Sequence, residues 1–162
     1  MRVLEKFCDF LAGCYKYSAC VFLAIVIVSS FVQVVTRYVF NNSLSWTEET
    51  ARYAFIWMSM LAAPVAMRKG MHASVNILDK IFKGNILVAQ QFLICLFILL
   101  AASLLITEGI KMMDVSMGKP STILRISMHY IYMAIPVGGL GIFMEALFKM
   151  LTLFRQRDRE AA

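Results

Sequence analysis

Four runs of the sequence contain no charged side chain, and their lengths constrain the fold more than any other feature. They cover 20, 15, 24 and 19 residues, at positions 17–36, 53–67, 84–107 and 126–144. A helix needs about 20 apolar residues to cross the hydrocarbon core of a bilayer. None of the runs alternates apolar with polar residues, as the strands of a membrane barrel would. The runs therefore predict an all-α membrane protein with four transmembrane helices.

The composition agrees with a membrane protein. Hydrophobic residues make up 60% of the chain and charged residues 16%, against about 25% in soluble domains. A soluble domain of 162 residues could not cover so much apolar surface with so few charges. We therefore expect a single membrane domain over residues 1–162. Its predicted segments are spans near 17–36, 47–67, 84–107 and 127–149, followed by a basic C-terminal tail at 150–162.

The second run is shorter than a bilayer crossing, so the predicted span 47–67 includes a charged first turn. Glu48 lies four residues before Arg52 and Glu49 lies three before it, so both pairs share one helix face. Ser45 stands three residues before Glu48, which is the spacing of a capping box. We expect Ser45 to be the N-cap and the charges to neutralise each other in part.

The distribution of basic residues predicts the orientation. Eleven of them lie in the N-terminal segment, the middle loop and the C-terminal end, against 4 in the two remaining loops. Loops rich in Lys and Arg stay in the cytoplasm, so both termini are predicted to face the cytoplasm. The net charge of +6 follows from this topology, and we expect no nucleic-acid partner.

Two short segments have the apolar periodicity of helices that lie on a membrane surface. Residues 2–16 form either such an amphipathic helix near the N-terminus or the start of a long first helix, and the sequence leaves both open. A smaller amphipathic stretch lies at residues 74–83 in the predicted cytoplasmic loop.

Few side chains are available for chemistry. The four cysteines include no C-x-x-C pair of the kind that membrane thiol oxidoreductases use. His72 and His129 are predicted on opposite sides of the membrane, which disfavours a haem or a metal site. We therefore expect no enzyme, no cofactor and no bound metal.

Glu145 is the one acidic residue well inside an apolar run. A small proton-coupled exporter needs such a group, but Lys149 follows one turn later, and an ion pair near the end of the span accounts for Glu145. An independent small oligomeric transporter that uses Glu145 remains the alternative function.

Small residues recur at helix-packing spacing. Ser59 with Ala63 in the second span, and Ala134 with Gly138 in the fourth, are small-x-x-x-small pairs that let membrane helices approach closely. Packing within the chain explains most of this pattern, and a scaffold subunit would have the same pattern.

Three motifs occur in order along the chain. They are VTRYVF, LSWTEE and ARY within residues 35–53, RKGMHASV at 68–75, and IYMAIPVGG at 131–139. Together they resemble the small membrane subunit of TRAP (tripartite ATP-independent periplasmic) transporters, the DctQ-type family. Asn76 departs from the usual Asp of that family, and Arg125 and Ser127 stand where the family often has Gly and Pro.

The resemblance implies a non-catalytic scaffold subunit in the bacterial inner membrane. Such a subunit pairs with a large, elevator-type membrane subunit and helps a periplasmic substrate-binding protein to dock. The large subunit is then expected to bind sodium and the substrate, an organic anion such as a C4-dicarboxylate or sialic acid.

The resemblance also selects candidate contact residues. The candidate partner interface comprises Arg37, Trp46, Glu48, Glu49 and Arg52, with Arg37 within reach of Glu48 or Glu49. The alternative is that Trp46 anchors the chain at the membrane interface and the charges cap a helix. Arg68, Lys69 and His72 are candidates for contact with membrane lipids or partner loops, and the alternative is that they only form a basic cytoplasmic loop. The loop from Lys111 to Arg125 is a second candidate contact with the binding protein.

Overall fold

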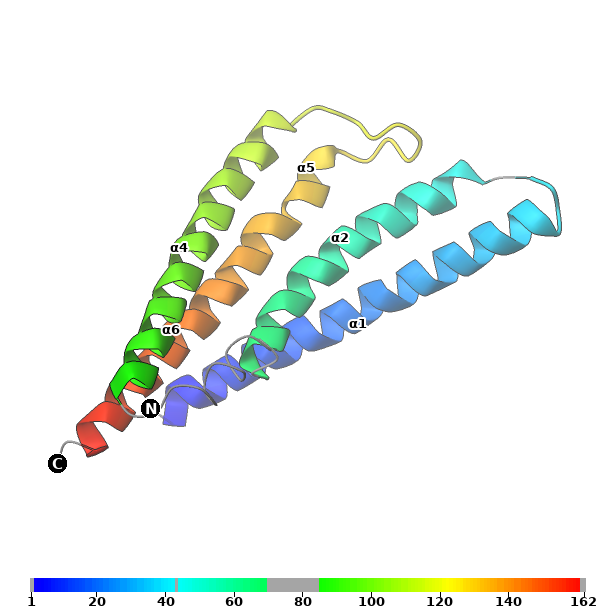
Figure 1. Ribbon diagram of the computed structural model, residues 1–162. Coiled ribbons are helices and arrows are strands. Elements are labelled where there is room, and N and C mark those ends of the chain that lie inside the picture. The colour runs from blue at the N-terminus through cyan, green and yellow to red at the C-terminus, as the bar shows by residue number, and fades with distance from the viewer. Residues whose placement is uncertain (1, 43, 70–84, 161–162) are drawn as a thin grey trace.

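The computed structural model describes residues 2–42, 44–69 and 85–160, and its regular elements over these ranges are helices, as the sequence predicts. They are α1 (Arg2–Tyr38), α2 (Ser45–Arg68), α4 (Asn85–Val115), α5 (Met128–Tyr132) and α6 (Ala134–Glu160). Figure 1 shows two long hairpins, α1 with α2 and α4 with α6, that diverge toward their connecting turns. We call this diverging end the turn end, and the end that holds both chain termini the terminal end.

The first helix runs without a break from Arg2 to Tyr38. The N-terminal residues are therefore the start of a long first helix, which is one of the two possibilities that the sequence left open. At 1.5 Å per residue, 37 residues give a length of about 55 Å, well beyond the roughly 30 Å of a bilayer core. A helix of this length tilts in the bilayer or extends past it.

Three helical segments within the described ranges are long and apolar enough to cross a membrane. They are Cys8–Tyr38, Gln90–Val115 and Met128–Thr152. Helix α2, whose first turns carry Glu48, Glu49 and Arg52, is not among them. The fourth crossing, at 47–67, therefore stays a prediction. The predicted surface helix at 74–83 lies outside the described residues.

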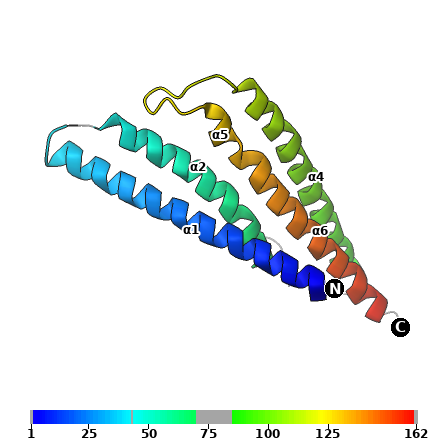
Figure 2. The same cartoon turned by 180° about the vertical axis from the view of Figure 1, so that it is seen from behind.

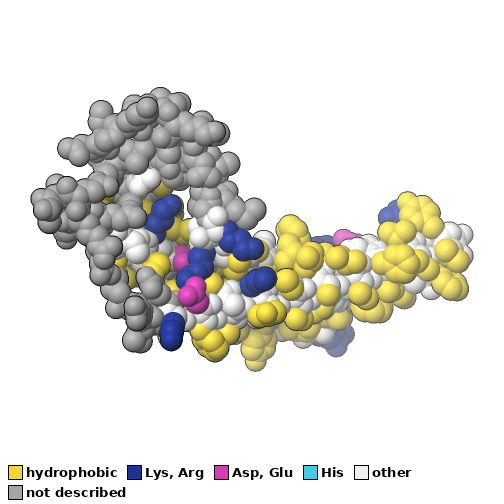
Figure 3. Space-filling view, turned by 90° about the horizontal axis from the view of Figure 1, so that it is seen from below, with side chains coloured by type: hydrophobic (Ala, Val, Ile, Leu, Met, Phe, Trp, Pro, Cys, Tyr) yellow, Lys and Arg dark blue, Asp and Glu magenta, His cyan; other side chains and the backbone are white. Residues whose placement is uncertain are grey.

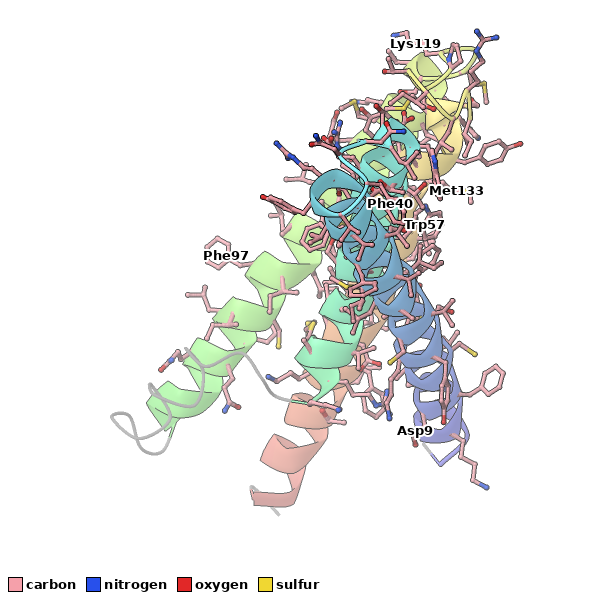
Figure 4. All side chains as sticks on the ribbon, turned by 90° about the vertical axis from the view of Figure 1, so that its right-hand side faces the viewer. Asp9, Phe40, Trp57, Phe97, Lys119 and Met133 are labelled. Atoms are coloured by element: carbon pink, nitrogen blue, oxygen red, sulfur yellow. The ribbon has the colours of Figure 1, made fainter. Side chains whose placement is uncertain are left out.

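The long helices pack in the spatial order α1, α2, α6 and α4, with α2 and α6 in the middle. The view from behind in Figure 2 shows the same order. Consequently α1 and α4 keep broad apolar faces that no other described helix covers. Phe97 of α4, for example, is 64% exposed and projects away from the bundle (Figure 4).

Prolines of one helix pack on glycines of the next. A Cβ built on Gly141 of α6 would lie 2.8 Å from Cγ of Pro64 in α2, and one on Gly109 of α4 would lie 2.8 Å from Cδ of Pro136 in α6. These approaches are closer than any side chain at either glycine would allow. Pro136 also lies in the first turn of α6, just after the break at Met133 that separates α5 from α6.

The predicted N-cap of α2 is wrong by one residue. Leu44 occupies the N-cap position without a side-chain hydrogen bond, and Ser45 is already helical. Thr47 makes the local contact instead, since both its N–H and its hydroxyl donate to the Leu44 carbonyl, at 3.1 and 2.6 Å. Because Ser45 already belongs to the first turn, it cannot act as the N-cap of the predicted capping box.

Candidate functional site

Glu49 joins the two hairpins at the turn end. Its Oε1 accepts a hydrogen bond of 2.6 Å from the Tyr53 hydroxyl, one helical turn further along α2. Its Oε2 accepts from the backbone N–H groups of Ile123 and Leu124, at 3.0 and 2.9 Å. The residue is only 4% exposed, so the carboxylate is withdrawn from solvent and its partners replace water. We call these four residues the Glu49 cluster.

The loop that Glu49 holds, residues 116–127, has a defined internal structure. Pro120 and Ser127 form an antiparallel β-bridge, and the N–H of Ser121 donates to the carbonyl of Ile126 at 2.8 Å. The side-chain oxygen of buried Ser121 in turn accepts from the N–H of Ile126 at 3.2 Å. Arg125 lies at a φ of 52°, in the left-handed region that favours glycine. A glycine would adopt this backbone conformation at lower cost than the arginine does.

The other predicted interface residues remain on the surface. Arg52 and Glu48 form an exposed ion pair of 2.8 Å, as their spacing predicts. The predicted pair between Arg52 and Glu49 is wrong, because Glu49 points into the bundle while Arg52 stays outside. Trp46 is 46% exposed, and Arg37 makes no ion pair with any residue of the described ranges, so its expected reach to Glu48 or Glu49 is not observed.

A second set of charges joins three helices at the terminal end. Arg68, the last residue of α2, donates from Nη1 to Oε1 of Glu145 in α6 at 2.8 Å, and from Nη2 to Oδ1 of Asp9 in α1. The guanidinium carbon also lies 5.8 Å from the centre of the Phe148 ring. We call Asp9, Arg68 and Glu145 the Arg68 cluster. Figure 4 shows Asp9 at the opposite end of the molecule from Lys119, which belongs to the loop held by Glu49.

This arrangement corrects the predicted partner of Glu145. The sequence favoured Lys149, one turn later on the same helix, but the described partner of Glu145 is Arg68 from another helix. Glu145 is 8% exposed, and a guanidinium fork satisfies a buried carboxylate better than a flexible ammonium does. The same contacts commit the side chain of Arg68 to two carboxylates. Lys69 follows α2 and is exposed, whereas His72 lies outside the described residues.

The predicted packing residues lie between helices to different degrees. Ala134 is fully buried at the start of α6. A Cβ on Gly138 would lie 2.7 Å from the backbone oxygen of Met60 in α2, so α6 packs directly on that carbonyl. Pro64 lies four residues after Met60 and has no N–H to donate to the Met60 carbonyl. The close contact with Gly138 covers this carbonyl oxygen instead. Ser59 and Ala63 are partly exposed, and the Ser59 hydroxyl donates within its own helix, to the Ile56 carbonyl.

Sequence reasoning missed three participants in these contacts. Tyr53 entered the sequence analysis only as the last residue of the ARY motif, and Asp9 only as part of the amphipathic segment 2–16. The four-residue spacing from Glu49 to Tyr53 was an available signal for their contact. Tyr15 was missed altogether. Its hydroxyl donates to the Val137 carbonyl at 2.8 Å and links α1 to α6 beside Gly141. No local spacing indicates a contact between residues so far apart in the chain.

Comparison with known proteins gives a family. The family described as "Tripartite ATP-independent periplasmic transporters, DctQ component" matches residues 25–156. A Haemophilus influenzae protein assigned as a TRAP transporter small permease protein is 45% identical over 56 residues, which is 35% of either chain. The small permease protein SiaQ of a Vibrio cholerae sialic acid TRAP transporter is 21% identical over 123 residues, 76% of this chain and 71% of SiaQ.

A further relative is much longer than this chain. The sialic acid TRAP transporter permease protein SiaT of Haemophilus influenzae is 27% identical over 137 residues, 85% of this chain but only 21% of SiaT. This chain thus spans about a third of the length of the Haemophilus influenzae small permease protein and about a fifth of the length of SiaT. Since the family match extends over most of the chain, the protein belongs to the DctQ family of TRAP transporter components, and it is a multi-pass protein of the bacterial inner membrane that serves transport rather than catalysis.

Proposed function

We propose that this chain is the fixed scaffold subunit of a sodium-coupled TRAP importer. It pairs with a large, elevator-type membrane subunit that binds sodium and substrate, and it helps a periplasmic substrate-binding protein to dock. The observation that carries the proposal concerns Glu49 and Glu145, the two acidic residues that are buried within the described ranges. Both are committed to structural contacts, Glu49 with the loop at 116–127 and Glu145 with Arg68 of α2. A coupling acid must gain and lose a proton or an ion during each cycle, whereas these two hold the hairpins together.

The uncovered apolar faces of the outer helices support a large membrane partner. The apolar stretch of α1 is exposed along most of its length, and only 17% of the most hydrophobic window of α4 is buried. Figure 3 shows hydrophobic side chains along much of the visible surface. SiaT adds support, because the region equivalent to this chain is part of a longer permease polypeptide there. A chain that is covalently joined to a larger permease in one protein is expected to bind such a permease where the two are separate.

The proposed topology has four crossings and both termini in the cytoplasm. Helix α2 packs beside α1 and α6, so in this proposal it crosses the membrane together with them. The Arg68 cluster then lies at the cytoplasmic face and the Glu49 cluster at the periplasmic face. This orientation puts the loop at 116–127 where a periplasmic protein can reach it.

The proposed substrate is an organic anion, either a C4-dicarboxylate or a sialic acid. This follows from the relatives, which are named for sialic acid and for C4-dicarboxylate transport. Both solutes are carboxylates. The substrate and sodium sites are assigned to the large subunit, and no cofactor is proposed for this chain.

The docking role is divided between direct and indirect contributors. Trp46, Arg37 and the Glu48–Arg52 pair are exposed at the turn end and are available to a partner. Glu49 is buried, so its contribution is to fix the shape of the loop at 116–127. This division modifies the interface expected from the sequence, in which all five residues touched the partner.

A charge exchange tests the direct contact. Arg52→Glu breaks the Glu48–Arg52 pair, whereas the double variant Glu48→Arg, Arg52→Glu rebuilds the pair with its charges exchanged. If these side chains touch a partner, both variants lower recovery of the complex or uptake. Full recovery in the double variant would show that only the intramolecular pair matters, and would refute the contact.

Co-expression tests the pairing itself. An affinity tag on a large TRAP membrane subunit from the same organism should recover this chain as a stable complex through size-exclusion chromatography. Elution of the chain alone, with the large subunit intact, would contradict the proposal. The alternative, an independent oligomeric transporter using Glu145, requires uptake by this chain alone that Glu145→Gln abolishes. The ion pair from Arg68 to Glu145 counts against that alternative, because it occupies the coupling acid.

A further inference from the structure

A pocket opens beside the Arg68 cluster, between the end of α2 and α6. Its volume is about 360 Å³, which is within the usual range for small-ligand sites. The lining side chains are Met67, Arg68, Glu145, Phe148, Lys149 and Thr152. Apolar and charged groups therefore line the same space, which suits a ligand that has both a charged and an apolar part.

The charges of the pocket are unequally engaged. Arg68 donates to both Glu145 and Asp9, so two carboxylates surround its single positive charge. Lys149 makes no ion pair with any residue of the described ranges, and a lysine ammonium has three donors. The exposed Lys69 follows Arg68 directly. Within the described residues, Lys69 and Lys149 thus have no carboxylate partner. With Arg68 they give three basic side chains against two carboxylates at or near the pocket, which favours an anion.

The position of the pocket selects the kind of anion. It lies at the terminal end, close to the ends of helices that cross the membrane, where headgroups meet the protein. Seen from below in Figure 3, basic side chains surround acidic ones, and hydrophobic side chains lie next to them. A phospholipid headgroup supplies a phosphate at this depth, and its glycerol and upper acyl carbons can contact Met67 and Phe148.

We propose that the pocket between α2 and α6 binds the headgroup of an anionic phospholipid, with Lys149 as the group that contacts the phosphate. The cytoplasmic placement of the site rests on the proposed topology, but the binding itself does not. In the membrane the lipid fills a crevice that two helices leave open near the Arg68 cluster, and it supports their packing.

Native mass spectrometry of the whole chain released from detergent micelles tests the proposal. The probes are dioleoyl phosphatidylglycerol and, as a neutral-headgroup control, dioleoyl phosphatidylcholine. Phosphatidylglycerol should bind more tightly, and Lys149→Gln should weaken its binding about fivefold, the effect of one basic residue near a headgroup. Lys149→Arg should keep the preference. Thr152→Phe, which fills the pocket without changing its charge, should also weaken binding.

Lys111 provides the matched control, because it lies at the turn end in an exposed pair with Glu108. Lys111→Gln should leave phosphatidylglycerol binding unchanged. Equal binding of the two lipids, or wild-type binding in both Lys149→Gln and Thr152→Phe, would overturn the proposal. Displacement of the lipid by an equal concentration of inorganic phosphate would also overturn it, since the site would then take a free anion. Each readout uses this chain alone, so its outcome is independent of pairing with a large subunit.

Discussion

Replacing Glu49 by glutamine should loosen the loop at 116–127 without unfolding the bundle. The glutamine has nearly the same shape, so it leaves no cavity. Its single oxygen can still accept from the two backbone N–H groups of Ile123 and Leu124, with its amide turned toward the Tyr53 oxygen. What the variant loses is the negative charge that strengthens these bonds.

The expected magnitude follows from the two loop contacts. A hydrogen bond to a charged group contributes about 1.5–3 kcal/mol, against about 0.5–1.5 kcal/mol for a neutral pair. Two such bonds, to the N–H groups of Ile123 and Leu124, therefore weaken by a total of about 2 kcal/mol. Local opening of the loop should become roughly 30-fold more frequent.

Amide hydrogen exchange measures this opening directly. In detergent-solubilised protein, the Ile123 and Leu124 amides should exchange roughly 30-fold faster in Glu49→Gln than in the wild type. Glu48→Gln is the matched control, because the neighbouring carboxylate is 60% exposed in a surface pair worth at most about 1 kcal/mol. It should leave these two amides unchanged. Equal protection of both amides in wild type and Glu49→Gln would refute the role of Glu49.

Three further predictions concern the thermal unfolding midpoint in detergent. Gly138→Ala should destabilise the protein by about 1–3 kcal/mol, because the new methyl group meets the backbone oxygen of Met60. The methyl group of Gly13→Ala points into open space, so this control should not lower the midpoint. Equal midpoints for the two variants would contradict the close approach at Gly138. Arg68→Ala should cost about 3–5 kcal/mol by leaving Glu145 buried without a partner, and the double variant Arg68→Met, Glu145→Met should recover most of the loss; a double variant as unstable as the single one would contradict this. Arg125→Gly should stabilise the protein by about 1 kcal/mol by relieving the left-handed backbone, and a lower midpoint would argue against strain there.

The helices could be predicted from the sequence because their signals are local. The length of an uncharged run and the four-residue spacing of Glu48 and Arg52 do not depend on how the helices are arranged. The same local argument was equally consistent with a Glu49–Arg52 pair and with the observed contact to Tyr53. Only the loop that folds over α2 decides between them, and that loop begins more than 65 residues later.

The Arg68 cluster shows the same limit at the other end. Lys149 is the nearest basic residue to Glu145 along the helix, so local reasoning chose it. The actual partner comes from α2, whose end is brought to α6 by the contact of Pro64 with Gly141. Small residues at helical spacing indicate that helices pack closely, but they do not identify the helix on the other side. For this reason the sequence could point to a close-packing position such as Gly138 but missed the ion pair.

Uptake by proteoliposomes tests most directly whether this chain is a scaffold. Vesicles that hold this chain with the large subunit, supplied with the binding protein and an inward sodium gradient, should accumulate a C4-dicarboxylate or sialic acid. Vesicles that hold either membrane subunit alone should not. Uptake by this chain alone, or undiminished uptake when it is left out, would contradict the account.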